Sequence, residues 1–153
     1  MTVGPGKKLP AFSLPRSDGS AWKSADATFP LVLYFYPKDM TEGCTLEGRD
    51  FRDLHASFKR ARTTVLGLSK DSCERHAKFR AKEDCPFELL SDETEKVCRL
   101  FDVIREKTLY GRKFMGIERS TFLFDTNGKL AREWRKVRVK GHAAEVLEAA
   151  RSL

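Results

Sequence analysis

One uninterrupted apolar segment constrains the fold of this 153-residue chain most. Residues 31–36 read Leu-Val-Leu-Tyr-Phe-Tyr and are followed by Pro37. The segment is far shorter than the roughly 18 apolar residues that cross a membrane. A short run without polar alternation is typical of a strand buried on both faces, as in a parallel sheet. Because helices cover the faces of such a sheet, the segment predicts an α/β protein.

The rest of the chain alternates strand and helix patterns around this segment. Helices are predicted over residues 41–62, 72–83, 92–101 and 141–150, and further strands over 63–69, 87–90, 120–124 and 130–139. Turn signals at residues 17–20 and 125–128 predict an N-terminal β-hairpin and a closing one. Residues 105–117 show no clear period and are predicted to form an ordered loop. The order predicts a central mixed β-sheet flanked by helices, in one domain over residues 1–153.

Charge and composition argue against several classes of protein. Lys and Arg number 29 and Asp and Glu 22, giving a net charge of +7, but the two signs are interspersed along the chain. No nucleic-acid motif accompanies the charge, so we expect no nucleic-acid partner. Met1 is followed by no apolar signal region, and we expect a cytoplasmic protein without a membrane partner. In that compartment the four cysteines are not expected to form structural disulfides.

The residues between the apolar strand and the next helix carry the chemistry. Catalytic and binding groups of α/β sheets gather beyond the carboxyl ends of strands. Cys44 falls there, in the first turn of the predicted helix, where free amide groups and the helix dipole stabilise a thiolate. Thr41 lies three residues earlier, within reach of the sulfur or of a bound oxygen. Position alone leaves open that Cys44 is a small core residue and Thr41 merely a helix cap.

The surrounding motif resembles a known family. Pro37-x3-Thr41-x2-Cys44-x2-Glu47, after a Tyr-Phe-Tyr strand, is similar to the active-site loop of peroxiredoxins. The resemblance continues at residues 67–72, 89–92, 98–103 and 117–123, in the order and spacing of the bacterioferritin comigratory protein subfamily, also called peroxiredoxin Q. It covers roughly residues 5 to 150, and this co-linear series is far more specific than a lone Pro, Thr, Cys pattern.

The resemblance implies a thioredoxin-like fold and a thiol-dependent peroxidase of antioxidant defence. Such enzymes reduce hydrogen peroxide and organic hydroperoxides without metal, haem or flavin, so we expect no cofactor. Cys44 matches the peroxidatic cysteine, whose thiolate becomes a sulfenic acid. Thr41 and Arg119 match residues that hold the peroxide and activate the thiolate, although Arg119 alone would suggest only a surface arginine at the start of a strand. Pro37 is expected to shield the thiolate, and Glu47 to orient an arginine.

The thiol that clears the sulfenic acid is not evident. Relatives carry a resolving cysteine five residues after the peroxidatic one, or on the next helix in a Phe-Cys-Ala-Lys context. The matching positions here are Arg49 and Arg80. Cys85 is then the first candidate for a resolving cysteine and Cys73 the second, whereas Cys98 is expected to be a buried structural thiol. A one-Cys enzyme resolved by an outside thiol remains equally open.

Other kinds of redox or metal protein fit the residues less well. A thioredoxin-type disulfide oxidoreductase needs Cys-x-x-Cys, but Glu47 stands where the second cysteine would be. Cys73 and His76 form the only close Cys/His pair, too few ligands for zinc, so we expect no metal site. His55 and His142 are interpreted as surface or helix-face residues. A redox sensor or chaperone-like interaction protein using the same thiolate is the alternative function.

The family also suggests partners. The substrate is expected to be a peroxide, and the reductant thioredoxin, with glutaredoxin or glutathione as alternatives. Relatives of this subfamily are usually monomeric, which implies a monomer here. The net charge of +7 suggests an acidic reductant, whose reaction would then slow as salt rises.

Overall fold

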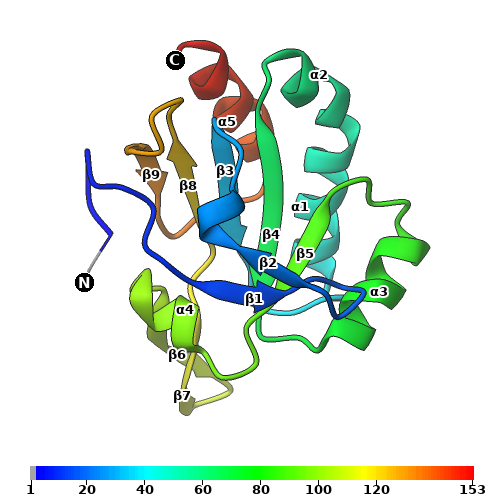
Figure 1. Ribbon diagram of the computed structural model, residues 1–153. Helices are drawn as coiled ribbons and strands as arrows, with labels where there is room; N and C mark the ends of the chain where they lie inside the picture. The colour runs from blue at the N-terminus through cyan, green and yellow to red at the C-terminus, as the bar shows by residue number, and fades with distance from the viewer. Residues whose placement is uncertain (1–2) are drawn as a thin grey trace.

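A five-stranded mixed sheet forms the centre of the protein, which a computed structural model describes over residues 3–153 (Figure 1). The strands lie in the order β5-β4-β3-β8-β9. Their bounds are Leu31–Phe35 for β3, Thr64–Ser69 for β4, Glu88–Ser91 for β5, Ser120–Phe124 for β8 and Leu130–Trp134 for β9. The first three are parallel, and β8 and β9 are antiparallel to their neighbours. The predicted mixed sheet is confirmed.

Alternate residues of β3 supply two separate cores, one on each face of the sheet. Val32 and Tyr34 pack with four helices: α1 (Glu42–Asp53), α2 (His55–Arg60), α3 (Cys73–Lys82) and α5 (His142–Arg151). Leu33 and Phe35 face the predicted N-terminal hairpin, β1 (Ser13–Pro15) and β2 (Ala21–Lys23), together with the short helix α4 (Lys96–Leu100). A 3-10 turn over Ser24–Asp26 follows β2. Every residue of β3 is buried, as its uninterrupted apolar sequence predicts.

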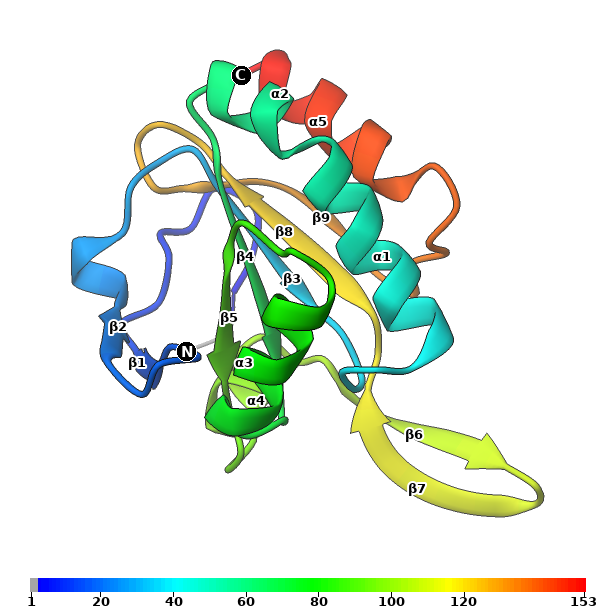
Figure 2. The same cartoon turned by 90° about the vertical axis from the view of Figure 1, so that its right-hand side faces the viewer.

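Residues 105–117 are not the loop that the sequence predicts. They form most of an antiparallel hairpin, β6 (Ile104–Leu109) and β7 (Arg112–Ile117), which projects from the body of the protein (Figure 2). Most of its side chains are exposed or half-buried, so neither face imposes the apolar alternation by which strands are recognised. Tyr110 and Gly111 close it with positive φ angles of 51° and 77°, as a tight hairpin turn requires.

Three other predicted elements have different bounds. The helix expected over residues 92–101 is shorter and forms only α4, Lys96–Leu100. The helix expected over residues 41–62 is interrupted at Leu54, which separates α1 from α2. The last strand ends at Trp134 rather than at residue 139, because the chain then turns toward α5. Within residues 3–153, none of the helices combines the length and the apolar character that crossing a membrane demands.

Strand order brings distant residues to one edge of the sheet. β3 and β8 are antiparallel, and Phe35 at the end of β3 lies opposite Ser120 at the start of β8. Arg119, the residue before Ser120, therefore lies beside the segment that leads from β3 into α1. The carboxyl ends of the parallel strands meet at this same edge, which is where α/β proteins place their sites.

Candidate active site

Cys44 occupies the third position of α1 and is 3% exposed. The first backbone bond of this helix runs from the N–H of Thr45 to the carbonyl of Thr41, at 2.9 Å. The N–H groups of the preceding turn thus have no carbonyl partner within the helix, and the side chain of Thr41 does not cap them. Such a helix start favours negative charge on a thiol placed within it.

The guanidinium of Arg119 joins two acidic groups on α1. Its Nη2 donates to Cys44 Sγ at 3.4 Å, and its Nη1 donates to Glu47 Oε1 at 2.6 Å. Burial disfavours its charge, but Glu47 and Cys44 outweigh that effect and raise the pKa of Arg119. Gly43 makes room for it, since a Cβ at that position would lie 3.2 Å from Nη2. This role of Gly43 was not predicted, because a single glycine carries no sign of a partner distant in sequence.

Glu47 holds Arg119 from a buried position. Its side chain is 1% exposed, and among the described residues its Oε2 has no hydrogen-bond partner. Burial raises the pKa of Glu47 to about 7, because desolvation of the carboxylate outweighs the attraction of Arg119. The contact with Arg119 therefore helps to keep the buried Glu47 carboxylate charged.

Thr41 and Pro37 flank the cysteine differently. Thr41 precedes α1 with an extended backbone and an exposed side chain. Its Oγ1 donates to the carbonyl of Lys38 at 2.8 Å. That hydroxyl neither caps the helix nor bonds the sulfur of Cys44 in the part of the chain described, so it stays accessible to an incoming oxygen. Pro37 is half-buried and lines a surface pocket.

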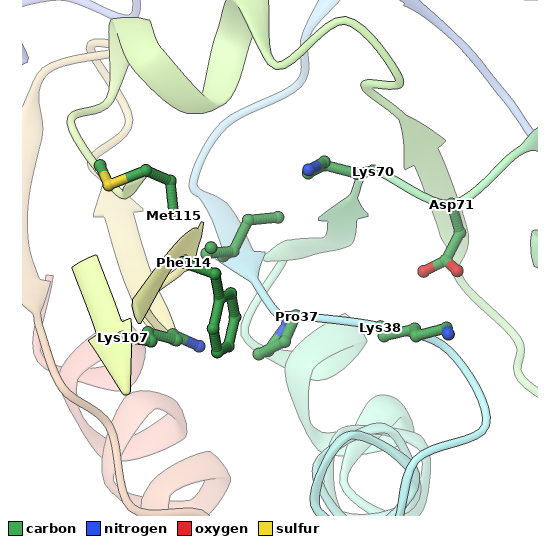
Figure 3. A pocket seen from close by; sticks show the side chains of 9 residues that line it. Pro37, Lys38, Lys70, Asp71, Lys107, Phe114 and Met115 are labelled. Carbon is green, nitrogen blue, oxygen red and sulfur yellow. The ribbon is translucent and has the colours of Figure 1, made fainter. Parts of the chain in front are cut away.

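This pocket lies between the start of the active-site segment and the β6–β7 hairpin (Figure 3). Its volume is about 460 Å³, and its lining residues are Pro37, Lys38, Lys70, Asp71, Lys107, Phe114, Met115, Gly116 and Ile117. Lys107 projects into it beside Phe114 (Figure 3). Burial and the nearby charge of Arg119 lower the pKa of Lys107. The hairpin residues of this pocket were not predicted as part of a site, because their sequence was interpreted as a loop.

Comparison with known proteins decides the family. A sequence model described as "AhpC/TSA family" matches residues 5–133. Peroxiredoxin Bcp of Bacillus subtilis is 47% identical over 154 residues, covering 100% of this chain and 98% of that protein. Peroxiredoxin Bcp of Xanthomonas campestris is 49% identical over 147 residues, covering 93% and 92%. The chain belongs to the AhpC/TSA family.

Solved structures of this family superpose on the chain. A cysteine-to-serine variant of PrxQ from Xylella fastidiosa matches with a TM-score of 0.92 and 41% identity, over 99% of this chain and 98% of that one. A structure of the Xanthomonas campestris bacterioferritin comigratory protein, described as addressing its alkyl peroxide reduction, matches with a TM-score of 0.87 and 46% identity, over 92% and 90%. The thioredoxin-like fold and the resemblance to peroxiredoxin Q are confirmed. The protein is a thiol-dependent peroxidase.

The other three thiols of this peroxiredoxin have different surroundings. Cys85 is buried on the same face of the sheet as Cys44, and its Sγ donates to the carbonyl of Phe87. Burial raises the pKa of Cys85 to about 11. Cys73 is half-buried as the first residue of α3. Cys98 belongs to the core on the opposite face, as expected of a structural thiol. All four thiols are free.

The two arginines at the usual resolving positions form ion pairs. Arg49 Nε lies 2.6 Å from Glu83 Oε1, which ties α1 to the end of α3. Arg80 Nη1 lies 2.9 Å from Glu88 Oε2 and also donates to Ser17. Both positions therefore carry contacts between elements in this member of the family.

The three histidines have different surroundings. Of the two predicted places for His142, surface or helix face, the structure has the helix face: it is the first residue of α5, is 4% exposed, and Thr121 Oγ1 lies 2.8 Å from its Nε2. Burial lowers the pKa of His142 to about 4. His76 is fully buried, and its Nδ1 lies 2.6 Å from Asp39 Oδ2. His55 lies half-buried at the start of α2.

Proposed function

We propose that Cys44 is the peroxidatic cysteine of this enzyme, that Arg119 activates it, and that Glu47 positions Arg119. The observation that carries this proposal is the guanidinium of Arg119, which contacts both Cys44 Sγ and Glu47. A permanent cation at this distance stabilises a thiolate, and its spare N–H groups can stabilise negative charge on a departing oxygen. The exposed hydroxyl of Thr41 supports its role as a contact for the bound peroxide.

The chemical step transfers one oxygen to sulfur. The thiolate of Cys44 attacks the terminal oxygen of the hydroperoxide, a sulfur–oxygen bond forms, and the O–O bond breaks. Sulfur is oxidised to sulfenic acid while the peroxide is reduced to an alcohol, or to water when the substrate is hydrogen peroxide. The leaving oxygen carries away the electron pair of the O–O bond and takes up a proton. The cationic group beside Cys44 stabilises that oxygen before it is protonated.

The pocket beside Pro37 supports the reduction of organic hydroperoxides. Phe114, Met115 and Ile117 give it an apolar wall that suits a hydrocarbon group. The similar Xanthomonas campestris protein is itself described as having alkyl peroxide reduction activity. We infer that the organic part of a substrate occupies this pocket while its peroxide group faces Cys44.

The surroundings of the thiols favour resolution of the sulfenic acid by a thiol from outside the chain. Arg49 and Arg80 occupy the usual resolving positions, and Cys98 lies across the sheet from Cys44. Cys85 is buried with a raised pKa, so little of the attacking thiolate is present. The outside thiol condenses with the sulfenic acid, releasing water, and a second thiol then reduces the mixed disulfide.

We propose thioredoxin as that reductant. Seven large apolar side chains in residues 3–153 are more than a third exposed. Met40 and Leu46 lie close to Cys44 in sequence, and four others belong to the β6–β7 hairpin: Leu109, Tyr110, Phe114 and Met115. The β6–β7 hairpin adds an excess of cationic over anionic side chains. An apolar surface with a basic rim fits an acidic protein that must reach Cys44, whereas a small peroxide needs no such surface.

The experiment is a steady-state assay of peroxide consumption with thioredoxin, its reductase and NADPH. We expect many turnovers per enzyme, unchanged in Cys73→Ser and Cys85→Ser variants and absent in Cys44→Ser. A redox sensor would consume about one peroxide per chain and stop. Loss of turnover only in Cys85→Ser or Cys73→Ser would overturn the outside-thiol route and identify the resolving cysteine.

We also propose that the protein is a monomeric, single-domain cytoplasmic enzyme. Four free cysteines suit a reducing compartment. Size-exclusion chromatography is expected to give the mass of one chain, and denaturant a single unfolding transition. Elution as a dimer would contradict the monomer.

A further inference from the structure

A buried polar cluster lies beside the active-site segment, and the proposed chemistry does not use it. Its centre is Asp39, two residues before Thr41 and 1% exposed. Both carboxylate oxygens of Asp39 are engaged: Oδ1 accepts from the hydroxyl of Tyr36, and Oδ2 lies 2.6 Å from His76 Nδ1. A carboxylate so deeply buried is costly unless its charge is matched, so the partners on α3 matter.

The backbone of Asp39 is held as well. Its N–H donates to Asp71 Oδ2 at 2.8 Å, and its carbonyl accepts from Arg75 Nη2 at 3.2 Å. Asp71 is itself fixed by the hydroxyl of Ser69 at 2.6 Å and by Arg75 Nε at 2.9 Å. The polar groups of Asp39 therefore contact three places: Tyr36 just after β3, helix α3, and the turn between β4 and α3.

His76 is committed at both ring nitrogens. Its Nε2 lies 3.0 Å from the carbonyl of Leu90, which can only accept, so Nε2 carries a hydrogen. Its Nδ1 faces the carboxylate of Asp39, and one proton lies between them. Both groups are fully buried, and in such surroundings a hydrogen bond is electrostatically stronger than the same bond in water. Asp39, Asp71 and His76 lie close enough to suggest a metal site, but Ser69, Arg75 and Tyr36 already donate to the carboxylates.

The next residue shows why the segment needs such support. Met40 has a φ angle of 64°, a left-handed conformation that non-glycine residues rarely adopt. Such a strained backbone conformation persists only where surrounding contacts hold it in place. Residues of this kind are concentrated at functional sites. Thr41 and α1 follow directly, so the conformation of residues 37–41 sets where Cys44 Sγ lies relative to Arg119.

We propose that Asp39 and His76 are positioning residues for Cys44. Their buried contact fastens the active-site segment to α3 and keeps Cys44 beside Arg119 during the reaction with peroxide. The inference rests on the proposed role of Cys44. It also implies that when the contact is broken, the segment relaxes and Cys44 becomes accessible to large reagents.

The test compares two rates at Cys44 in Asp39→Ala. The rate constant for hydrogen peroxide is measured by stopped flow, and labelling of Cys44 by N-ethylmaleimide is followed by peptide mass spectrometry. We expect the peroxide rate to fall by roughly 10- to 100-fold, since small misplacements of reacting groups have effects of that order. We expect labelling to accelerate, because Cys44 is only 3% exposed in the intact enzyme and becomes accessible when the segment relaxes.

Two further variants separate positioning from folding. Asp39→Asn should restore most of the peroxide rate, because the amide can donate to an unprotonated Nδ1 and still accept from Tyr36. Tyr36→Phe removes one donor to Asp39 and should lower the peroxide rate by roughly three- to tenfold, which keeps the test possible if Asp39→Ala fails to fold.

The matched control is Asp92→Ala. Asp92 is equally buried, at 1% exposed, but its carboxylate accepts from the backbone of Val97 and Cys98 in α4, across the sheet. This variant should lose stability without the paired change in the two rates. Equal effects of Asp39→Ala and Asp92→Ala on both rates would overturn the inference. Peroxidase activity surviving in Cys44→Ser would instead overturn the proposed role of Cys44.

Discussion

Cys44 and Cys98 hold the same position in two helices, but the charged side chains beside them differ. Each is the third residue of its helix, and both are buried. Beside Cys44 lies the guanidinium of Arg119, and the N-cap side chain of α1 leaves the helix start free. Beside Cys98 lies the carboxylate of Asp92, which accepts from the N–H of Cys98 at 2.7 Å. Burial, reinforced by Asp92, raises the pKa of the Cys98 thiol far above its ordinary range.

The comparison shows that a helix start does not by itself make a cysteine reactive. At α4 the carboxylate of Asp92 accepts hydrogen bonds from the N–H groups of Val97 and Cys98. It also places a negative charge where a thiolate would form. At α1 the amides remain available and a cation adds to them. We infer that the charge of the nearest side chain distinguishes the two buried thiols and favours Cys44 as the nucleophile.

The largest expected difference between the two sites lies in activity. Cys44→Ser should abolish peroxide consumption, because Cys44 combines a free helix start with a bonded guanidinium and Cys98 has neither. Cys98→Ser should leave the rate near that of the unmodified enzyme, with at most a small loss of stability. Peroxide consumption by each variant, at equal protein concentration, measures this. Activity lost in Cys98→Ser but kept in Cys44→Ser would reverse the comparison.

Removing the cation should make the Cys44 site resemble the Cys98 site. Arg119→Met keeps an unbranched side chain but leaves the thiolate without its partner, and we expect the peroxide rate constant to fall by roughly 100- to 1,000-fold. Arg119→Lys keeps a positive charge but lacks the forked guanidinium that contacts both Cys44 and Glu47. Its rate constant should therefore lie between those of the unmodified enzyme and Arg119→Met. Stopped-flow measurement with hydrogen peroxide gives all three values. An equal rate constant in Arg119→Met and the unmodified enzyme would contradict the proposal that Arg119 activates Cys44.

Glu47 should make stability depend on pH. Its pKa is raised to about 7 in the folded protein, so the folded state binds the proton more tightly than the unfolded state does. The stability it contributes is full below its ordinary pKa and is lost as pH rises through 7, by up to about 3 kcal/mol. Glu47→Gln cannot ionise, so its stability relative to the unmodified protein should rise between pH 5 and pH 8.

Urea unfolding of both proteins at the two pH values measures this difference. An equal gap in free energy of unfolding at pH 5 and pH 8 would show that Glu47 keeps its ordinary pKa. The rate with peroxide should meanwhile fall less in Glu47→Gln than in Arg119→Met, because Glu47 acts only through Arg119.

Ionic strength should have the smallest effect, and only on one half of the cycle. Reduction by an acidic protein should slow several-fold as salt rises, since screening weakens its attraction to a chain of charge +7. Reaction with hydrogen peroxide should stay constant because that substrate is uncharged. Both rates are measured on the same preparation, and a flat salt dependence for the reductant would remove the electrostatic part of its docking.

The sequence was most informative where local pattern and burial agree. Residues 31–36 predicted a strand buried on both faces, and the structure confirms it. The motif around Cys44 indicates the family without any knowledge of the geometry. The hairpin over residues 104–117 was missed because its exposed faces leave no periodic signal. Long-range contacts were also beyond local pattern: nothing near His76 in the sequence indicates that it meets Asp39.

The most direct test of the active-site assignment is intact mass under non-reducing conditions after one equivalent of hydrogen peroxide, followed by peptide mapping. We expect one or more added oxygens on Cys44, with Cys98 unchanged and no disulfide within the chain. A loss of two hydrogens mapped to Cys44 with Cys85 or Cys73 would keep Cys44 as the reacting thiol but contradict the outside-thiol route. Oxidation of another cysteine while Cys44 stays untouched would contradict the central claim.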